Sequence, residues 1–378
     1  MENAATQIGL RYEGLRIAVE STLASHLAWL EEFLTPAFTV GAPQPSDWRV
    51  TLHENDARYA AIVGQGPVPD ALPLACFGLD HDWIRLPRWR NAAGVRTVVD
   101  EQGGVAYEVD PVRRTVVLTG EPRALALRTA LMRVVRELAM RCAQRRGGLF
   151  LHAAALAIGS RGLVLAGEKD AGKTTLLVNL LRHDAARYVA NDRVLVGCSV
   201  ATMPLRGMPT IVSIRPGTLE FFPHLHRQLV ASGFNYRHTL QEAAATHDAV
   251  ARPWRDGRFG VSPAQFCALL GVEQMGTCEI SAVLFPRVVP EEPTIGLRQL
   301  GSRDAAQRLA ATVFGRAAPL EQESLWDSDA EVYRHHDELL IARVEHLADR
   351  LPCFECRLGR NAHTSVSAAT EIARRLVA

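Results

Sequence analysis

The sequence predicts a protein of α/β and α+β class, with a P-loop core over residues 148–378 and a smaller N-terminal α+β domain over residues 1–147. Three observations predict this division. Strand-like runs separated by turns fill the first part, and the pattern changes at a helix stop, Arg145–Gly148. A glycine-rich segment then lies between an apolar strand and a helix. A length of 378 residues is enough for two domains.

In the N-terminal part we expect a strand from Leu15 (LRIAVES), a helix over Thr22–Leu34 and a strand over Trp48–Glu54. A Pro- and Gly-rich break separates this helix from the second strand. Three β-runs between Val95 and Leu118, separated by turn residues, predict an antiparallel meander. Apolar residues at helical spacing predict a helix over Glu121–Arg145. This part carries no recognisable chemistry, and substrate recognition is the role we expect for it.

The second part alternates apolar strands with helices. Leu149–Ile158 and Leu163–Ala166 read as strands, a helix begins near Lys173, and one strand from Tyr188 carries Asn191-Asp192-Arg193 and continues through VLVG. The later elements share clear start or stop signals: a helix over Ser262–Gly271, a strand over Cys278–Phe285 ended by Pro286, a helix over Ser302–Phe314 with Ser302 as its N-cap, a strand over Pro352–Leu358 and a helix over Ser367–Leu376.

The glycine-rich segment fits the pattern G-x-x-x-x-G-K-[ST] at every fixed position. Such a loop lets successive backbone N–H groups face an anion at a helix N-terminus. The chain has only two lysines, Lys169 and Lys173, and both lie in this segment. A lysine is a compact point charge that reaches into a phosphate cradle, whereas arginine is a planar fork. We therefore expect ATP-Mg²⁺ to bind here, through Gly167, Glu168, Lys169, Asp170, Ala171, Gly172, Lys173, Thr174 and Thr175.

A Mg²⁺-nucleotide site needs a second acid on a neighbouring strand. Asp192, which follows the apolar run Tyr188–Ala190, is the candidate to bind Mg²⁺ together with the Thr174 hydroxyl, or to accept the proton of an attacking hydroxyl group. The alternative is a turn-forming Asn-Asp pair after a strand. Arg193 is a candidate phosphate clamp, with a solvent-facing arginine as the alternative.

These motifs together resemble the catalytic core of HPr kinase/phosphorylase and the wider set of HPr-kinase-like proteins, which includes kinases of lasso-peptide biosynthesis. The resemblance rests on Leu151-His152-Ala153, Gly162, the P-loop segment and Val189–Val194, with weaker echoes around Arg206–Pro209 and Arg215–Thr218. It covers residues 149–219 well and extends in patches to about residue 287, whereas the first 145 residues are uncovered.

The resemblance implies a P-loop core with a mixed sheet, similar to that of phosphoenolpyruvate carboxykinase, and ATP-dependent phosphorylation of a serine hydroxyl. It also implies catalytic roles for Lys173 and Asp192, for His152 near the γ-phosphate or acceptor, and for Arg215 on the transferring phosphoryl group. Arg206 is a further candidate cation. Where the family has paired aspartates, this chain has Asn191-Asp192. Because the second signature loop of the family is not reproduced, reversal by phosphorolysis is not expected.

Composition excludes several other classes of function. Lys plus Arg total 42 against 41 Asp plus Glu, so no global field favours nucleic acid or a membrane as partner. The N-terminal residues lack a signal-peptide pattern and no apolar run is long enough to span a bilayer, so we expect a cytoplasmic protein. Cys353 and Cys356 have CxxC spacing without a second pair, and we interpret them as ordinary strand residues.

The expected function is a kinase that transfers the γ-phosphate of ATP to a hydroxyl of a peptide or protein. A small-molecule kinase with the same core is one alternative. A nucleotide-binding regulatory protein without transferase activity is another, and the missing second aspartate is the feature that supports it. The sequence leaves open the acceptor and whether the chain forms a homo-oligomer.

Overall fold

The structure of the protein is a computed structural model that describes most of the chain. The described residues are 6–66, 74–76, 84–86, 88–90, 93–121, 126–168, 170–197, 203–245, 256–289, 291, 295–314, 331–359, 371–372 and 374–376. The chain divides into two compact units, residues 1–146 with 315–337 and residues 147–314 with 338–378. Each unit has its own sheet.

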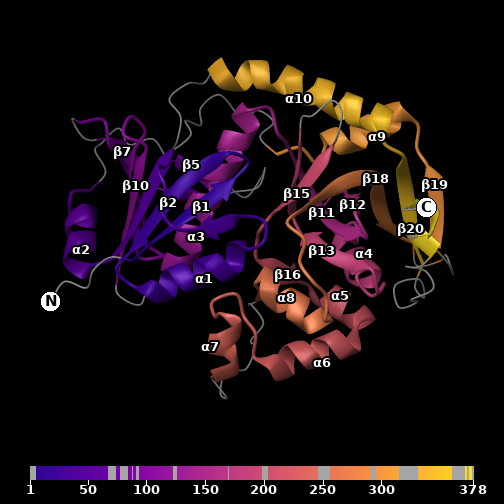
Figure 1. The fold of residues 1–378 in the computed structure, drawn as a ribbon, viewed down its shortest axis with the longest axis horizontal. Helices are drawn as coiled ribbons and strands as arrows, with labels where there is room; N and C mark the ends of the chain where they lie inside the picture. Colours follow the sequence, from indigo (N-terminus) through magenta and orange to yellow (C-terminus); the bar gives the residue numbers. More distant parts are fainter. Residues whose placement is uncertain are drawn as a thin grey trace. The chain divides into compact units, whose positions relative to one another are not determined.

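The first unit is built on an eight-stranded mixed sheet with the strand order β3-β1-β2-β4-β10-β9-β8-β7 (Figure 1). Strand β4 pairs in parallel with both β2 and β10, whereas the other pairs are antiparallel. Helices α1 and α3 pack on each other and on the sheet. The bounds are β1 Thr6–Tyr12, β2 Leu15–Ser21, α1 Ala24–Leu34, β3 Thr39–Gly41, β4 Trp48–Glu54, α2 Asp56–Gly64, β7 Arg88–Arg90, β8 Arg96–Asp100, β9 Val105–Asp110, β10 Thr115–Gly120 and α3 Ala126–Arg145, with β5 Leu74–Cys76 and β6 Ile84–Leu86 forming a separate pair.

The expected strands from Leu15 and Trp48, the first helix, the meander and the long helix before Arg145 are all confirmed. Strand β3 was missed, because it is three residues long and lies inside the Pro- and Gly-rich break. The chain after β3 passes close over β1, where a β-carbon on Gly9 would lie 2.6 Å from the carbonyl oxygen of Ala42. Such a short edge strand leaves no alternating pattern in the sequence.

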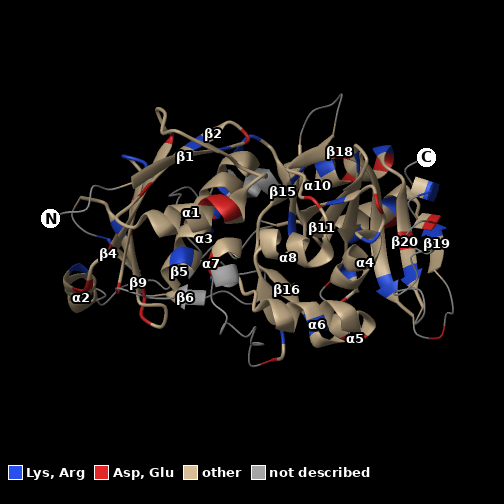
Figure 2. Ribbon diagram, turned by 60° about the horizontal axis from the view of Figure 1, so that its bottom comes forward, with Lys and Arg blue, Asp and Glu red and all other residues tan. Residues whose placement is uncertain are grey.

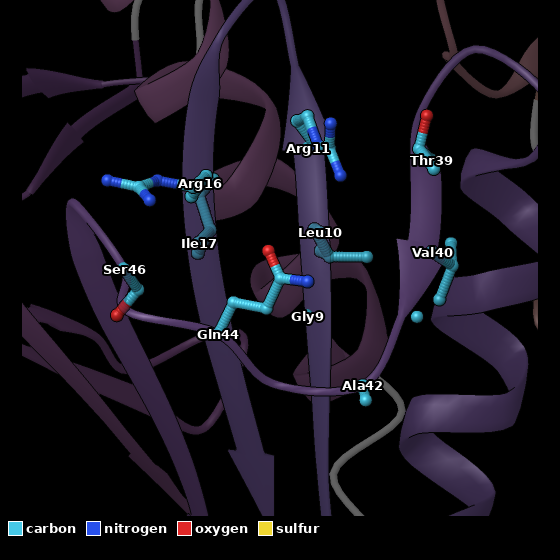
Figure 3. A pocket seen from close by; sticks show the side chains of 11 residues that line it. Gly9, Leu10, Arg11, Arg16, Ile17, Thr39, Val40, Ala42, Gln44 and Ser46 are labelled. Carbon is cyan, nitrogen blue, oxygen red and sulfur yellow. The ribbon is translucent and has the colours of Figure 1, made fainter.

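The segment after β3 also frames a shallow pocket of about 150 Å³ (Figure 3). Its lining includes Arg11, Arg16, Gln44 and Ser46 on the strands and the crossing segment. In Figure 3 the Gln44 amide points towards β1, whereas the Arg16 guanidinium points away from the pocket. No residue of the P-loop motif lines this pocket.

The second unit is built on a mixed sheet with the order β12-β11-β14-β15-β18-β20-β19, in which β13 also pairs with β11. Because β12 pairs with β18 as well as with β11, the pairings β12-β11-β14-β15-β18 close into a cycle. The bounds are β11 Leu149–Ile158, β12 Arg161–Ala166, α4 Lys173–Leu180, β13 Ala186–Ala190, β14 Arg193–Val196, β15 Pro204–Met208, β16 Val212–Ile214, α5 Pro216–Phe221, α6 Pro223–Ser232, α7 Leu240–Ala245, β17 Phe259–Val261, α8 Pro263–Leu270, β18 Thr277–Val288, β19 Ile295–Gln299, α9 Ser302–Ala310 and β20 Cys353–Leu358. Helix α10 spans Glu331–Arg350, and its residues 338–350 belong to this unit.

Helices cover both faces of this sheet, so its central strands are apolar on both sides (Figure 1). Leu163 and Leu165 of β12 belong to the core that contains α4, α6 and α8, whereas Val164 belongs to the core that contains α9 and the last turns of α10. The near-continuous apolar run of β11 has the same cause, since nine of its ten residues are buried.

Three expectations for this unit need correction. The strand expected from Tyr188 through VLVG is two strands, β13 and β14, with a bend at Asn191-Asp192, because β11 pairs with each of them separately. Strand β18 continues past Pro286 to Val288: its pairing with β12 ends at Leu284 and β20 alone accompanies the end, so the missing proline N–H is tolerated. Helix α9 ends at Ala310, and Gly301 rather than Ser302 is its N-cap.

The other expected elements are confirmed, among them the helix from Ser262, whose N-cap in the structure is a capping box of Ser262 and Gln265 on α8. Of the expected last helix, the described residues 371–372 and 374–376 are helical, and the rest lies outside the described residues. The protein is therefore a mixed α/β fold with mixed sheets. In the described part of the chain, every helix is too short or too polar to cross a membrane.

Candidate functional site

The segment between β12 and α4 turns the chain from a buried strand into a helix. Its backbone has positive φ at Gly167 (155°), Asp170 (69°) and Gly172 (97°). A β-carbon on Gly172 would lie 3.0 Å from Val288 Cγ2, so this position has neither the conformation nor the room for a side chain. Left-handed residues in a tight loop before a helix are typical of backbone nests that bind anions.

Lys173 is the first residue of α4, and its ammonium group folds back onto the loop. Nζ donates to the carbonyl oxygens of Gly167, at 2.7 Å, and Glu168, at 2.8 Å. Burial lowers the pKa of Lys173, and the carboxylates of Asp192 and Glu168 act in the opposite direction. Asp192, in the bend between β13 and β14, therefore lies within electrostatic range of Lys173 at the start of α4.

Asp192 lies in the bend between β13 and β14, beside the first half of β11. Its carbonyl oxygen accepts from the Ala153 N–H at 3.0 Å, which holds the bend against β11. Its Oδ1 lies 3.1 Å from Nε2 of His152, a residue of β11. Both side chains are 27% exposed, so the pair is ordered by the sheet and still open to solvent. Such a pair can take up a proton.

Phe314, just after α9, packs against this pair. Its ring centroid lies 5.7 Å from that of His152 and 4.7 Å from the guanidinium carbon of Arg193. The His152 N–H donates to Thr312 O at 2.6 Å, which fixes this segment on β11. Arg193 is 6% exposed with Nε 3.5 Å from Asp192 Oδ2, so the alternative of a solvent-facing arginine is wrong.

Asn191 is held by three hydrogen bonds inside the second unit. Its Oδ1 accepts from the Tyr188 hydroxyl at 2.7 Å and from Thr210 Oγ1 at 3.1 Å, and its Nδ2 donates to Ile211 O at 3.3 Å. Tyr188 is buried and packs edge-on against Phe266. The side chain of Asn191 therefore anchors the bend, and Asp192 alone presents its carboxylate to His152.

Arg215 is the N-cap residue of α5, and its guanidinium forms an ion pair with the Asp170 carboxylate of the loop. This contact gives the loop aspartate a partner, which the sequence did not supply. Thr175 is buried and its hydroxyl shares a hydrogen bond of 3.1 Å with that of Thr218 on α5. The loop and the first turn of α4 are thus tied to α5 at two points.

The structure brings together most of the residues that the sequence singled out. Gly167–Glu168, Asp170–Thr175, His152 and Asp192 surround one end of the sheet, and Arg215 joins them through Asp170. Ala171 and Thr174 are half-buried, and Glu168 is exposed. Arg206 lies half-buried in β15, one strand away from Arg193. Lys169 lies outside the described residues.

Cys353 and Cys356 confirm the expectation of ordinary strand residues. They point into the two different cores on either side of β20. Burial raises the pKa of both thiols, to about 11 for Cys353 and about 12 for Cys356. Among the described residues, no three His, Cys, Asp or Glu side chains gather as a metal site would require.

Sequence reasoning missed the residues that support the site. Phe314, Thr218 and Thr210 act through contacts with residues far along the chain, and no local periodicity marks such contacts. Tyr188 was read only as a strand residue. A buried tyrosine three residues before an asparagine is a weak signal for its hydrogen bond to Asn191.

Comparison of the chain with protein-family models gives no match, and comparison with curated proteins gives none either.

Proposed function

We propose that the chain is an ATP-dependent kinase that transfers the γ-phosphate to a serine hydroxyl of a peptide or protein. The observation that carries the proposal is the convergence of the Gly167–Thr174 loop with the His152–Asp192 pair. Ala166, the residue before the loop, pairs with Ala153, the residue after His152, and His152 Nε2 lies 3.1 Å from Asp192 Oδ1. The resemblance of the same motifs to HPr-kinase-like proteins supports the same reaction.

The residues of the site fit a nucleotide with Mg²⁺. The positive φ angles of Gly167, Asp170 and Gly172 suit a polyphosphate cradle. Mg²⁺ is usually held by one or two protein oxygens plus substrate phosphates, and the Thr174 hydroxyl and the Asp192 carboxylate are oxygens of that kind. When bound, Mg²⁺ supplies positive charge that neutralises the transferred phosphoryl group.

In the proposed reaction the acceptor oxygen forms a bond to the γ-phosphorus while the bond to the bridging oxygen of ADP breaks. Asp192 accepts the hydroxyl proton, and His152 orients the carboxylate through its 3.1 Å contact. Lys173 and the amides of the loop stabilise the negative charge of the phosphates. Arg215, next to the loop through Asp170, adds a further cation.

The first test is the nucleotide site. Lys173→Ala removes the ammonium group, and we expect the affinity for ATP-Mg²⁺ to fall by about a hundredfold, because a buried charge that contacts phosphates is lost. Calorimetry measures the affinity, and a thermal melt shows that the fold is kept. Lys173→Arg should be nearly as impaired, because the planar guanidinium does not fit the same cradle. Unchanged affinity in Lys173→Ala would refute the site.

The second test is the acceptor. The protein is incubated with γ-labelled ATP and an extract of the source cells, and macromolecules are then separated from small molecules. Label in the macromolecular fraction, lost with Asp192→Asn, supports the proposal. Label only in the small-molecule fraction would instead identify a small-molecule kinase.

A regulatory protein that binds ATP without transferring phosphate is the second candidate function. The observation that favours it is Asn191, whose side chain is engaged in the fold by three hydrogen bonds. Within the described part of the chain, Asp192 is then the one carboxylate that pairs with His152. This candidate predicts stoichiometric ATP binding with no label in either fraction.

A further inference from the structure

Arginines of β19, β20 and α9 converge on a single buried glutamate, Glu355, on the face of the sheet that α9 covers. Glu355 Oε2 lies 2.8 Å from Arg308 Nη2 and 3.3 Å from Arg298 Nη2, and Oε1 lies 2.9 Å from Arg357 Nε. We call these four residues the arginine cluster. In Figure 2 blue segments mark arginine positions on β19 and β20. None of the four belongs to the site described above.

Among the described residues, positive charge predominates at the cluster. The Glu355 carboxylate lies against three guanidinium groups, and Arg287 stands next to Arg357 in the register of β18 and β20. Asp304 is the acidic residue in the first turn of α9, one turn before Arg308. The side chain of Glu355 is 4% exposed, whereas those of Arg298, Arg308 and Arg357 are 54%, 39% and 40% exposed.

The side chains of the arginine cluster are also held in place before any ligand binds. Arg308 stacks over the Phe285 ring, with its guanidinium carbon 5.7 Å from the centroid. Arg298 and Phe285 flank Glu355 in the register of three adjacent strands. A guanidinium group has five N–H donors in a fixed fork, and its bond to Glu355 accounts for only part of them in Arg298 and Arg308. Such forks match carboxylate groups bidentately.

The cluster lies at the same end of the strands as the phosphate loop. A β-carbon on Gly172 would lie 3.0 Å from Val288 and 3.9 Å from Leu358, the last residues of β18 and β20. Glu355 is three residues before Leu358, about 10 Å along the strand. An extended peptide of a few residues therefore spans the distance from the cluster to the loop.

We infer that the arginine cluster of Arg298, Arg308 and Arg357 binds acidic side chains of the polypeptide that this chain phosphorylates. The identity of the ligand as the acceptor rests on the proposed function, whereas the binding of a carboxylate-rich peptide does not. The cluster holds the acidic residues of the peptide, and the hydroxyl a few residues away reaches the loop.

The test measures binding without ATP, so its outcome is independent of the nucleotide site. A fluorescein-labelled hexaglutamate peptide is titrated with the full-length protein and followed by anisotropy, at about 50 and 300 mM NaCl. We expect binding that weakens with salt, and a loss of about tenfold or more in the double variant Arg298→Gln/Arg308→Gln.

Arg187→Gln is the matched control, because Arg187 is also a half-exposed arginine paired with a glutamate, Glu273, at 3.0 Å. We expect it to change the affinity less than about twofold. If the double variant fails a thermal melt, Arg298→Gln alone replaces it, since Arg298 is the most exposed of the three.

Two results would overturn the inference. Absence of hexaglutamate binding to the wild-type protein, or equal binding by the double variant, removes the cluster as a peptide site. Binding of inorganic pyrophosphate that depends on Arg298 and Arg308, without binding of hexaglutamate, assigns the cluster to a small anion. If hexaglutamate binds as expected but no acceptor is labelled, the peptide site stands and the proposed kinase function fails.

Discussion

Replacing Glu355 by Gln tests how much the arginine cluster contributes to the stability of the second unit. The three arginine hydrogen bonds, led by that from Arg357, hold the pKa of Glu355 at about 2, against an ordinary value of 4.5. By linkage this difference corresponds to about 3 kcal/mol of folding free energy at neutral pH. Because the arginines are half-exposed and screened by solvent, we expect about 2 kcal/mol.

The sign of the pH dependence follows from the depressed pKa. Above pH 4.5 the carboxyl group is ionised in both the folded and the unfolded chain, and the whole contribution is present. As the pH falls from 4.5 towards 2, Glu355 becomes protonated in the unfolded chain but stays ionised in the folded chain. The contribution of Glu355 to the folding free energy is therefore lost over this range. By pH 3.5 the loss is about 1 kcal/mol.

The assay is urea denaturation of the wild-type protein and Glu355→Gln at pH 7, 4.5 and 3.5, followed by circular dichroism. Other carboxyl groups titrate equally in both proteins, so the difference in unfolding free energy isolates Glu355. We expect a gap of about 2 kcal/mol at pH 7 that narrows by about 1 kcal/mol at pH 3.5. Glu371→Gln is the control, since Glu371 also pairs with two arginines but is exposed, and its gap should be smaller. A Glu355 gap that is constant or grows on acidification refutes the reasoning.

The remaining predictions concern the candidate site. Thr174→Val should weaken ATP binding about tenfold in Mg²⁺ but little in EDTA. Thr175 was expected to bind the nucleotide, but its buried hydroxyl is engaged by Thr218, so Thr175→Val should leave affinity unchanged and lower stability by about 1 kcal/mol. Calorimetry and urea denaturation separate the two variants. Gly172→Ala should lower the free energy of unfolding by about 2 kcal/mol and reduce ATP affinity, because the φ of Gly172 is 97° and Val288 is close. The control Gly159→Ala, at a position with φ 61° and open space, should lower the free energy of unfolding by about 1 kcal/mol and leave ATP binding intact. Asn191→Asp should destabilise the fold by about 1–3 kcal/mol and give no gain in phosphate transfer, because a carboxylate would face the Ile211 carbonyl oxygen; a gain in transfer would show that this side chain can leave its hydrogen bonds.

Local patterns predicted the elements around the site well. The strand before Gly167 and the helix from Lys173 are confirmed, because apolar runs and glycines act over a few residues. The break between β13 and β14 was not foreseen. It depends on the pairing of β11 with both strands, a contact that the run Tyr188–Val196 does not encode by itself.

Long-range contacts account for the other features that the sequence did not reveal. The sequence does not show how a carboxylate such as Asp170 is accommodated in a loop that binds an anion. In the structure its charge is balanced by Arg215, the N-cap residue of α5. The sequence does not reveal the partners of Glu355, because two of its three arginines come from other elements. Arg298 lies on β19 and Arg308 on α9, whereas Arg357 lies on the same strand as Glu355. From the sequence, Arg193 was either a phosphate clamp or a solvent-facing arginine. The structure excludes the second interpretation, because the Phe314 ring covers the guanidinium group.

The pairing of β11 on both sides limits how the two parts of the candidate site can move relative to each other. The Gly167–Thr174 loop follows β12, which pairs with one side of β11. Asp192 lies between β13 and β14, which pair with the other side of β11. A shift of Lys173 relative to Asp192 would therefore require β12 to move relative to β13 and β14. That movement would break backbone hydrogen bonds of β11, a strand buried in both cores. We therefore expect motion at the candidate site to involve elements outside β11, such as α5 and the segment at Phe314. In hydrogen–deuterium exchange the amides of β11 should be among the last to exchange, and those of α5 should exchange much earlier.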